Sequence, residues 1–266
     1  LKGLPEHALN TAKSLGADSG NYVLTLEQPC FHAVITYCEN EKLRKEVYQA
    51  YVTRASDQSQ AKQFDNSELI KQLLSLKHEQ SELLGFNNYA ELSIATKMAP
   101  STNKVMEFLT ELAEKSLKQA KQEFKELEEY ADKKLQPWDV AFYSEEQQQQ
   151  HYSISQEDLR PYFPQSKTIQ GMFSIASKLY GVHFEQKDNV STWNKDVNYY
   201  EIYNKDGSAC GGLYMDLYAR ENKRGGAWMD DFISYRKKSD DKIQTPVAFL
   251  TCNFAAPSNN QEAYFS

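Results

Sequence analysis

The spacing of apolar residues changes once along this chain, close to Gly181. Before that point apolar residues recur at intervals of three and four, as Leu69, Leu73 and Leu76 do. This spacing places them on one face of an α-helix. After that point the period is two, which is typical of β-strands. We therefore expect a mainly α-helical protein of the α+β class, with a small, mostly antiparallel β-sheet near the C-terminus.

The longest helix is expected from about Thr102 to Lys134, where apolar residues form one stripe and lysine and glutamate fill the other face. The hydroxyl of Ser101 is suited to cap its first turn. Such a helix packs along one side. The stripe lacks sustained heptads, which disfavours a coiled-coil dimer, so we expect this packing to lie within the chain.

Four segments after residue 181 predict strands. The clearest signal is a hairpin, in which two aromatic-rich runs flank a turn at residues 204–207. No linker or internal repeat separates the helical body, residues 1–181, from the β-rich segment, residues 182–266. We therefore expect the two to share one core as a continuous structural unit. The predicted strands lie in VHFEQ, in the hairpin VNYYEIYNKDGSACGGLYMDLYA, in GAWMDDFI and in TPVAFLTCNF.

Charge and composition argue against several classes of function. The chain of 266 residues has 30 basic and 37 acidic side chains, a formal charge of -7, which argues against binding nucleic acid through its phosphates. No apolar run approaches the roughly 20 residues that span a membrane. The four cysteines form no C-x-x-C pair, so they indicate neither a structural zinc site nor a redox motif and suit a reducing compartment. They are Cys30, Cys38, Cys210 and Cys252.

The stretch KHEQSELLG begins like the zinc-protease motif H-E-x-x-H, but Glu82 stands where the second histidine belongs. His78 and Glu82 share a helix face, yet a catalytic zinc needs a third protein ligand. His78 also follows Ile70 and Leu74 on one row of an ordinary packed helix, and we interpret Glu79 and Glu82 as residues on its solvent side. The other histidines, His7, His32, His151 and His183, are scattered.

The segment GLYMDLYARENKRGGAWMDD combines an aromatic strand, a charged turn and two adjacent glycines, Gly225 and Gly226. Glycines at the start of a strand leave its backbone bare, and a bare edge can pair with an extended peptide. The same glycines also suit a tight turn that requires a positive φ. The sequence leaves both interpretations open.

This segment, followed by TPVAFLTCNF, resembles the region just ahead of the zinc helix in the thimet-oligopeptidase family of zinc metallopeptidases. The resemblance implies a partial zincin-like metallopeptidase fold: a helical body that forms one wall of a deep channel, and a small sheet beside the zinc helix. It also implies zinc-dependent hydrolysis of short peptides during peptide degradation in the cytoplasm. Four earlier stretches share the resemblance: TYCENEKLRKEVYQAYVTRASDQ, LLGFNNYAELSIATKMA, LQPWDVAFYSE and YSISQEDLRPYFP.

In that family the H-E-x-x-H motif and a third ligand, a glutamate, follow the TCNF segment. The sequence stops at Ser266 before them, so we expect a central piece of a longer enzyme. We assign this chain no catalytic residue and no metal ligand, expect it to bind no zinc, and expect it to be inactive alone. Its expected partners are short unfolded peptides and the downstream zinc-binding part of the same protein, with no nucleic acid or membrane.

We assign substrate binding to Gly225, Gly226 and Ala227, whose strand would run antiparallel to the peptide backbone. Without the zinc helix, apolar strand residues such as Val247, Phe249 and Leu250 are expected to be exposed. The alternative function is a non-catalytic helical interaction or scaffold domain, because the chain by itself contains no catalytic constellation.

Overall fold

The computed structural model describes residues 1–257 and 263–265. The chain divides into two compact units. One unit combines Leu1–Asn40 with Gln148–Ser266, and we call it the sheet unit. The other unit is Glu41–Gln147, and we call it the helical unit. No helix among the described residues has the length and apolar character needed to cross a membrane.

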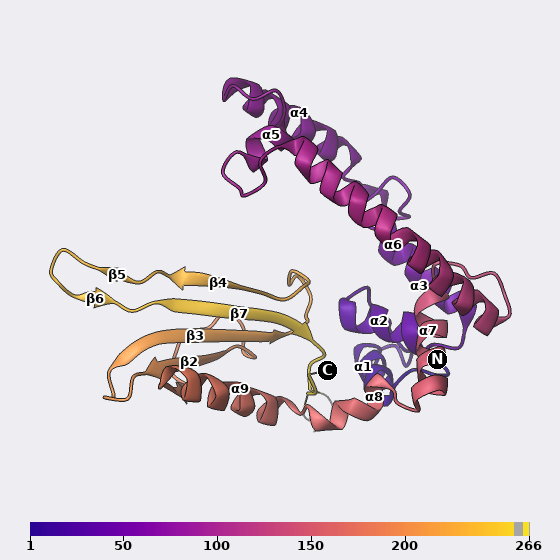
Figure 1. Cartoon of the computed structure of the whole chain (residues 1–266). Helices are drawn as coiled ribbons and strands as arrows, with labels where there is room; N and C mark the ends of the chain where they lie inside the picture. The colour runs from indigo at the N-terminus through magenta and orange to yellow at the C-terminus, as the bar shows by residue number, and fades with distance from the viewer. Residues whose placement is uncertain (258–262, 266) are drawn as a thin grey trace. The chain divides into compact units, whose positions relative to one another are not determined.

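The helical unit is built around α6, a helix of 30 residues (Figure 1). Ser101 caps α6 as expected, since its hydroxyl accepts a hydrogen bond from the Lys104 amide at 3.1 Å. The helix ends at Asp132, which has a left-handed φ of 51°. The elements are α3 (Glu41–Val52), η1 (Lys62–Phe64), α4 (Ser67–Leu83), α5 (Tyr89–Ile94), α6 (Thr102–Ala131) and α7 (Val140–Tyr152), whose last turns belong to the sheet unit.

The apolar stripes of α4 and α6 are exposed, which corrects the expectation that they pack within the chain. Leu73 on α4 and Leu112 on α6 are each more than half exposed, and Leu127 is the one fully buried residue that α6 contributes. The reason is geometric: α5 is the helix packed against both. At 1.5 Å per residue its six residues extend only about 9 Å, against about 45 Å for α6.

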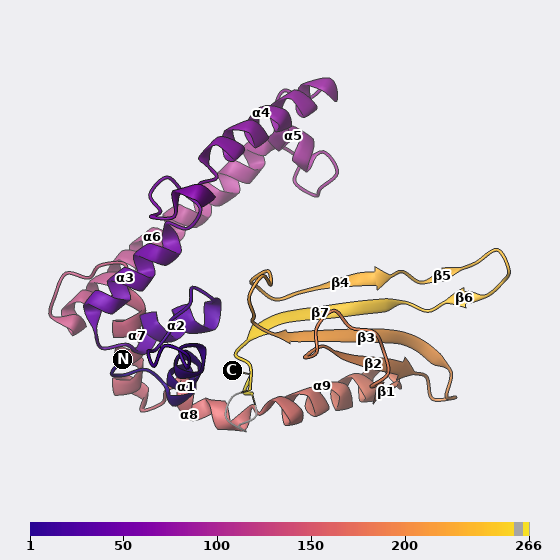
Figure 2. The same cartoon turned by 180° about the vertical axis from the view of Figure 1, so that it is seen from behind.

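The sheet unit contains the five-stranded sheet, in the order β1-β2-β3-β7-β4 (Figure 2). All pairings are antiparallel except the parallel pair β3–β7, so the expected α+β class is confirmed. The strands are β1 (His183–Gln186), β2 (Asn198–Tyr203), β3 (Ala209–Tyr218), β4 (Trp228–Ile233) and β7 (Val247–Phe254), and a small ladder joins β5 (Arg236–Lys237) to β6 (Ile243–Gln244).

The predicted hairpin is found as β2 and β3, joined by the expected turn. The next strand in the chain, β4, does not pair with β3. Instead β7 lies between them, parallel to β3 and antiparallel to β4. This order makes β4 an edge strand.

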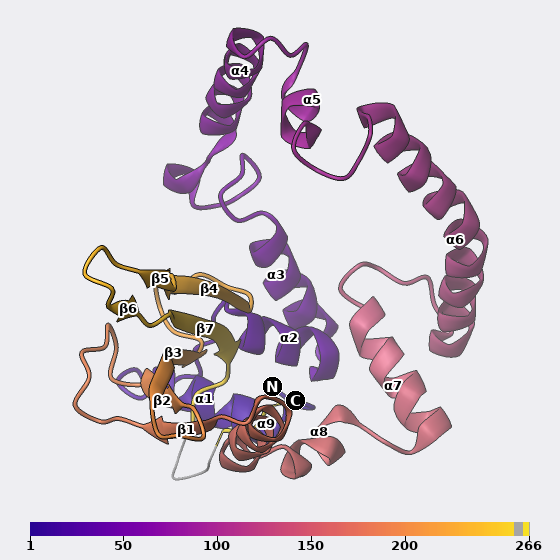
Figure 3. The same cartoon turned by 60° about the vertical axis from the view of Figure 1, so that its left-hand side comes forward.

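The two faces of the sheet differ. One face packs against α9 (Gln165–Tyr180), which runs along the sheet in Figure 1 and is seen nearly end-on in Figure 3. Ile169 and Phe173 of α9 meet Met215, Leu217 and Cys252 there. The other helices of this unit are α1 (Glu6–Leu15), α2 (Gln28–Tyr37), α8 (Gln156–Leu159) and η2 (Arg160–Tyr162).

The change from helix to strand expected near residue 181 occurs between α9 and β1. It lies inside the sheet unit, because α9 packs on the sheet, whereas the compact units divide near residues 40 and 147. The expected exposure of Val247, Phe249 and Leu250 is also corrected. All three are half-buried, because β7 is enclosed by β3 and β4 on its two sides.

Candidate functional site

Gly225, Gly226 and Ala227 lie together at the end of the loop that joins β3 to β4, and all three are exposed. Gly226 has a φ of 95°, a conformation that favours glycine, whereas Gly225 does not. A Cβ atom added at either glycine would meet no atom within 4 Å. The turn interpretation therefore holds for Gly226, and its reason is backbone conformation rather than crowding.

The strand that follows the glycines, β4, lies at an edge of the sheet. β4 pairs with β7 along one side, and no other strand among the described residues pairs with its outer side. An outer edge of this kind presents backbone N–H and C=O groups that an extended peptide can pair with. The two interpretations of the glycines are thus compatible, since a turn at Gly226 leads directly into an open edge.

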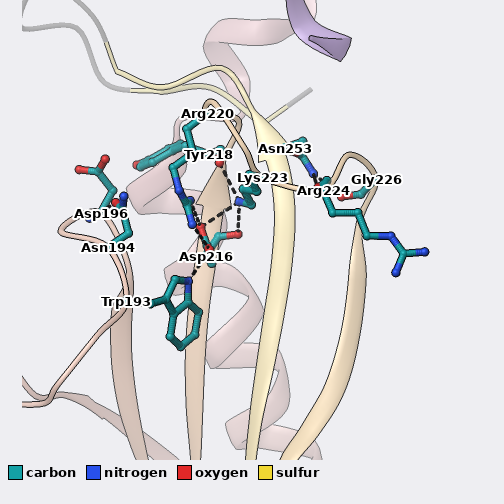
Figure 4. A network of polar contacts seen from close by, with 10 residues as sticks. All are labelled: Trp193, Asn194, Asp196, Asp216, Tyr218, Arg220, Lys223, Arg224, Gly226 and Asn253. Atoms are coloured by element: carbon teal, nitrogen blue, oxygen red, sulfur yellow. Dashed lines mark hydrogen bonds and ion pairs between the residues drawn. The ribbon is translucent and has the colours of Figure 1, made fainter. Parts of the chain in front are cut away.

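A buried carboxylate anchors the loop that carries the glycines (Figure 4). Asp216 on β3 is 3% exposed. It accepts two hydrogen bonds from the Arg220 guanidinium, at 2.6 and 2.8 Å, and one from Lys223 Nζ at 2.8 Å. Trp193 Nε1 donates a fourth at 2.8 Å. We call Trp193, Asp216, Arg220 and Lys223 the Asp216 clasp.

Lys223 also ties the loop to the backbone of β3. Its ammonium donates to the carbonyl oxygens of Asp216, at 2.9 Å, and Tyr218, at 2.7 Å. The side chain of Lys223 is 5% exposed, so its charge is compensated by these oxygens rather than by water. Arg220 and Lys223, the two cations of this network, both bond to the carboxylate of Asp216.

The clasp keeps Asp216 ionised. Burial opposes its charge, but the hydrogen bonds from Arg220, Lys223 and Trp193 outweigh this and lower the pKa of Asp216 from 3.8 to about 2. The same carboxylate raises the pKa of Arg220. A carboxylate that stays charged and fully hydrogen-bonded at neutral pH suits a structural anchor rather than a general acid or base.

Asn253 at the end of β7 holds the other end of the loop. Its side-chain amide donates to the Arg224 carbonyl at 3.1 Å and to the Gly226 carbonyl. Sequence reasoning missed both Asn253 and the clasp. The available signal was Asp216 itself, a charged residue inside an aromatic strand, with Arg220 and Lys223 closely following.

The residues that the structure describes do not form a zinc site. None of their His, Cys, Asp and Glu side chains gather in a group of three or more that could hold a metal ion. His78 Nε2 and Glu82 Oε1 lie 3.5 Å apart on α4 of the helical unit, and both side chains are exposed. This pair alone falls short of the three protein ligands of a catalytic zinc.

Comparisons with known proteins identify a family and several relatives. Residues 34–266 match the profile of peptidase family M3. Oligopeptidase A of Escherichia coli (strain K12) is 46% identical over 274 residues, which cover 100% of this chain and 40% of that protein. Dipeptidyl carboxypeptidase of the same organism is 27% identical, over 99% of this chain and 39% of that protein. Saccharolysin of Saccharomyces cerevisiae is 27% identical, over 98% of this chain and 39% of that protein. The chain thus spans about two-fifths of the length of these relatives.

Proposed function

Because the chain belongs to peptidase family M3, we propose that the protein is a zinc metalloendopeptidase that hydrolyses short peptides in the cytoplasm. The names of its relatives, oligopeptidase A and saccharolysin among them, support a peptidase. The net charge of -7 supports peptides rather than nucleic acid as its partners.

Within that protein we assign peptide binding to this chain. The observation that carries the assignment is the open edge of β4, which starts directly after Gly225, Gly226 and Ala227. An extended peptide would run antiparallel to β4 and bond to its backbone. Main-chain hydrogen bonds do not depend on the side chains of the peptide, so the protein would accept many sequences.

We assign the zinc ligands to residues outside the described part of this chain. The described residues lack a three-ligand group, and the printed sequence contains no H-E-x-x-H motif. In this proposal the chain alone is inactive, and its partner is the zinc-binding part of the same protein.

Replacing Gly226 with valine tests the peptide-binding assignment. We expect roughly tenfold weaker binding of a labelled short peptide, because a β-branched residue is strained at a φ of 95° and would displace the start of β4. The dissociation constant can be measured by fluorescence anisotropy with the 266-residue chain.

Gly207→Val is the matched control. Gly207 is an exposed glycine in the β2–β3 turn with a φ of 83°, and a Cβ there would likewise meet no atom within 4 Å. We expect this variant to bind peptide as the unchanged chain does. Equal affinities for Gly226→Val and Gly207→Val would remove the β4 edge from the binding site.

The exposed stripes of α4 and α6 favour a second candidate, a helical interaction domain without catalysis. Hydrolysis of a quenched short peptide by the full-length protein separates the two candidates. Hydrolysis that a chelator abolishes and zinc restores supports the peptidase. Its absence, together with an intact fold, supports the interaction domain.

A further inference from the structure

The sheet face opposite α9 carries a hollow of about 510 Å³ whose walls include five aromatic rings. It spans three neighbouring strands, β3, β7 and β4, and the loop before β2. Ring centroids lie 5.2 Å apart for Trp193 and Tyr214 and 5.1 Å apart for Trp228 and Phe249. We call it the aromatic hollow, and its rings are those of Trp193, Tyr214, Trp228, Phe232 and Phe249.

Three of the five rings around the hollow are open to solvent, whereas Tyr214 and Phe249 are half-buried. Trp193 is 53% exposed and Phe232 is 62% exposed, although each lies beside other aromatic rings. On the opposite face of the sheet, α9 covers the apolar side chains of β3 and β7. Large aromatic groups gathered at an open concave site are typical of binding sites.

Trp193 is held in place without any ligand. Its indole N–H is bonded to Asp216, which Arg220 and Lys223 fix in turn (Figure 4). Because the buried carboxylate of Asp216 fixes the orientation of the Trp193 ring, this wall of the hollow is already formed before a ligand binds. A preformed wall lowers the entropy that a ligand loses on binding.

The strand that offers the open edge also lines the hollow. Trp228 lies opposite Thr251 and Asp230 lies opposite Phe249, so these β4 residues share the hollow's face. Phe232 follows at an irregularity in the register and also lines the hollow. A peptide paired with β4 would place every second side chain on this face, with Cβ atoms about 5 Å from those of β4.

We propose that the aromatic hollow receives a large, uncharged side chain, preferably an aromatic one, from a peptide paired with the edge of β4. This inference rests on the proposed function and adds a selectivity to it. Charges of both signs surround the hollow and so support an uncharged occupant: Asp230, on the same face of β4, disfavours an acidic side chain. Lys223 and Arg224 line it and disfavour lysine or arginine, while the carboxylate of Asp216 is already bonded to Lys223 and Arg220.

A phenylalanine scan tests the proposal. Six-residue peptides of otherwise small, uncharged residues carry one phenylalanine at each successive position. We expect phenylalanine to tighten binding at least about tenfold at alternate positions, because ring burial of this kind contributes on the order of one tenfold step or more. The dissociation constants are measured by calorimetry with the 266-residue chain.

Three variants assign the effect to the hollow. Trp193→Ala is expected to reduce the phenylalanine-to-alanine affinity ratio to about 1, because a wall is lost. Trp193→Phe, which retains a ring, is expected to keep most of the ratio. Tyr180→Ala removes an exposed ring from α9, on the other face of the sheet, and is expected to leave the ratio unchanged.

The outcomes separate this inference from the proposed function. If peptides bind but the ratio is near 1, or survives Trp193→Ala, the hollow is not a side-chain pocket and the edge assignment stands. Tighter binding of a lysine peptide than of the phenylalanine peptide also overturns the inference. If no peptide binds at any position, the assignment of peptide binding to this chain fails and the hollow fails with it.

Discussion

Replacing Asp139 with alanine is expected to lower the free energy of unfolding of the helical unit by roughly 3–5 kcal/mol, because it breaks a buried ion pair. Asp139 and Arg44 are 0% and 2% exposed, and Arg44 Nη2 lies 2.6 Å from Asp139 Oδ1. Lys133 Nζ lies 3.0 Å from the second carboxylate oxygen. Removing the carboxylate leaves the Arg44 guanidinium buried without its counter-ion.

Hydrogen exchange followed by mass spectrometry can localise this effect. We expect faster exchange in α3 and in the start of α7, the elements that the Arg44–Asp139 pair joins. Glu111→Ala is the matched control, since Glu111 forms an exposed ion pair with Lys115 on α6. Exposed pairs contribute little, so this variant should exchange as the unchanged chain does. Identical exchange for Asp139→Ala would show that the buried pair does not stabilise the helical unit.

Replacing Asp216 with alanine is expected to destabilise the sheet unit by a similar amount, roughly 3–5 kcal/mol at pH 7. The change leaves Lys223 buried and Arg220 without the carboxylate that binds both. We also expect protease cleavage in the loop of residues 219–227, since the anchor of that loop is lost. Urea unfolding, followed by tryptophan fluorescence, gives the stability, and limited proteolysis reports the loop.

The stability that Asp216 provides also depends on pH, in a direction that its pKa dictates. The pKa of Asp216 is about 2 in the folded protein, below its ordinary value of 3.8. On acidification the unfolded chain therefore takes up the proton first. The part of its contribution that depends on protonation, about 2 kcal/mol, is complete above about pH 4 and is lost as the pH falls towards about 2.

A variant comparison isolates this pH dependence. The stability difference between the unchanged chain and Asp216→Ala should shrink between about pH 4 and pH 2. Asp188→Ala, which removes an exposed carboxylate from the β1–β2 loop, should show no such change. A difference that stays constant over this range would contradict the role of the Asp216 charge.

Local features of the chain were predictable because they depend on neighbouring residues. Ser101 caps the start of α6, and residues 204–207 form the turn between β2 and β3, as the sequence predicts. Each feature involves only residues a few positions apart in the chain. The end of α6 differs by three residues, since Asp132 adopts a left-handed conformation that the apolar pattern does not reveal. The family was predictable for another reason: several specific stretches occur together, and the M3 match confirms it.

The candidate site was predictable only in part. The glycines drew attention to the loop before β4, but periodicity reports that a segment is a strand and not which strand lies beside it. That β7 inserts between β3 and β4, and so opens the edge of β4, follows from pairings across the sheet. Trp193 gave no signal in the sequence, because its loop has neither helical nor strand periodicity.

The sequence by itself determined the change from helices to strands, the family and the region of the glycines, since each is encoded in contiguous residues. Only the tertiary structure decided the edge position of β4, the Arg44–Asp139 pair and the joining of Trp193 to Asp216. The partners in these two contacts lie 95 and 23 residues apart. Contacts between residues so far apart in the sequence depend on how the whole chain packs. A buried charge needs an oppositely charged or hydrogen-bonding partner, and only the fold decides which residue lies within bonding distance.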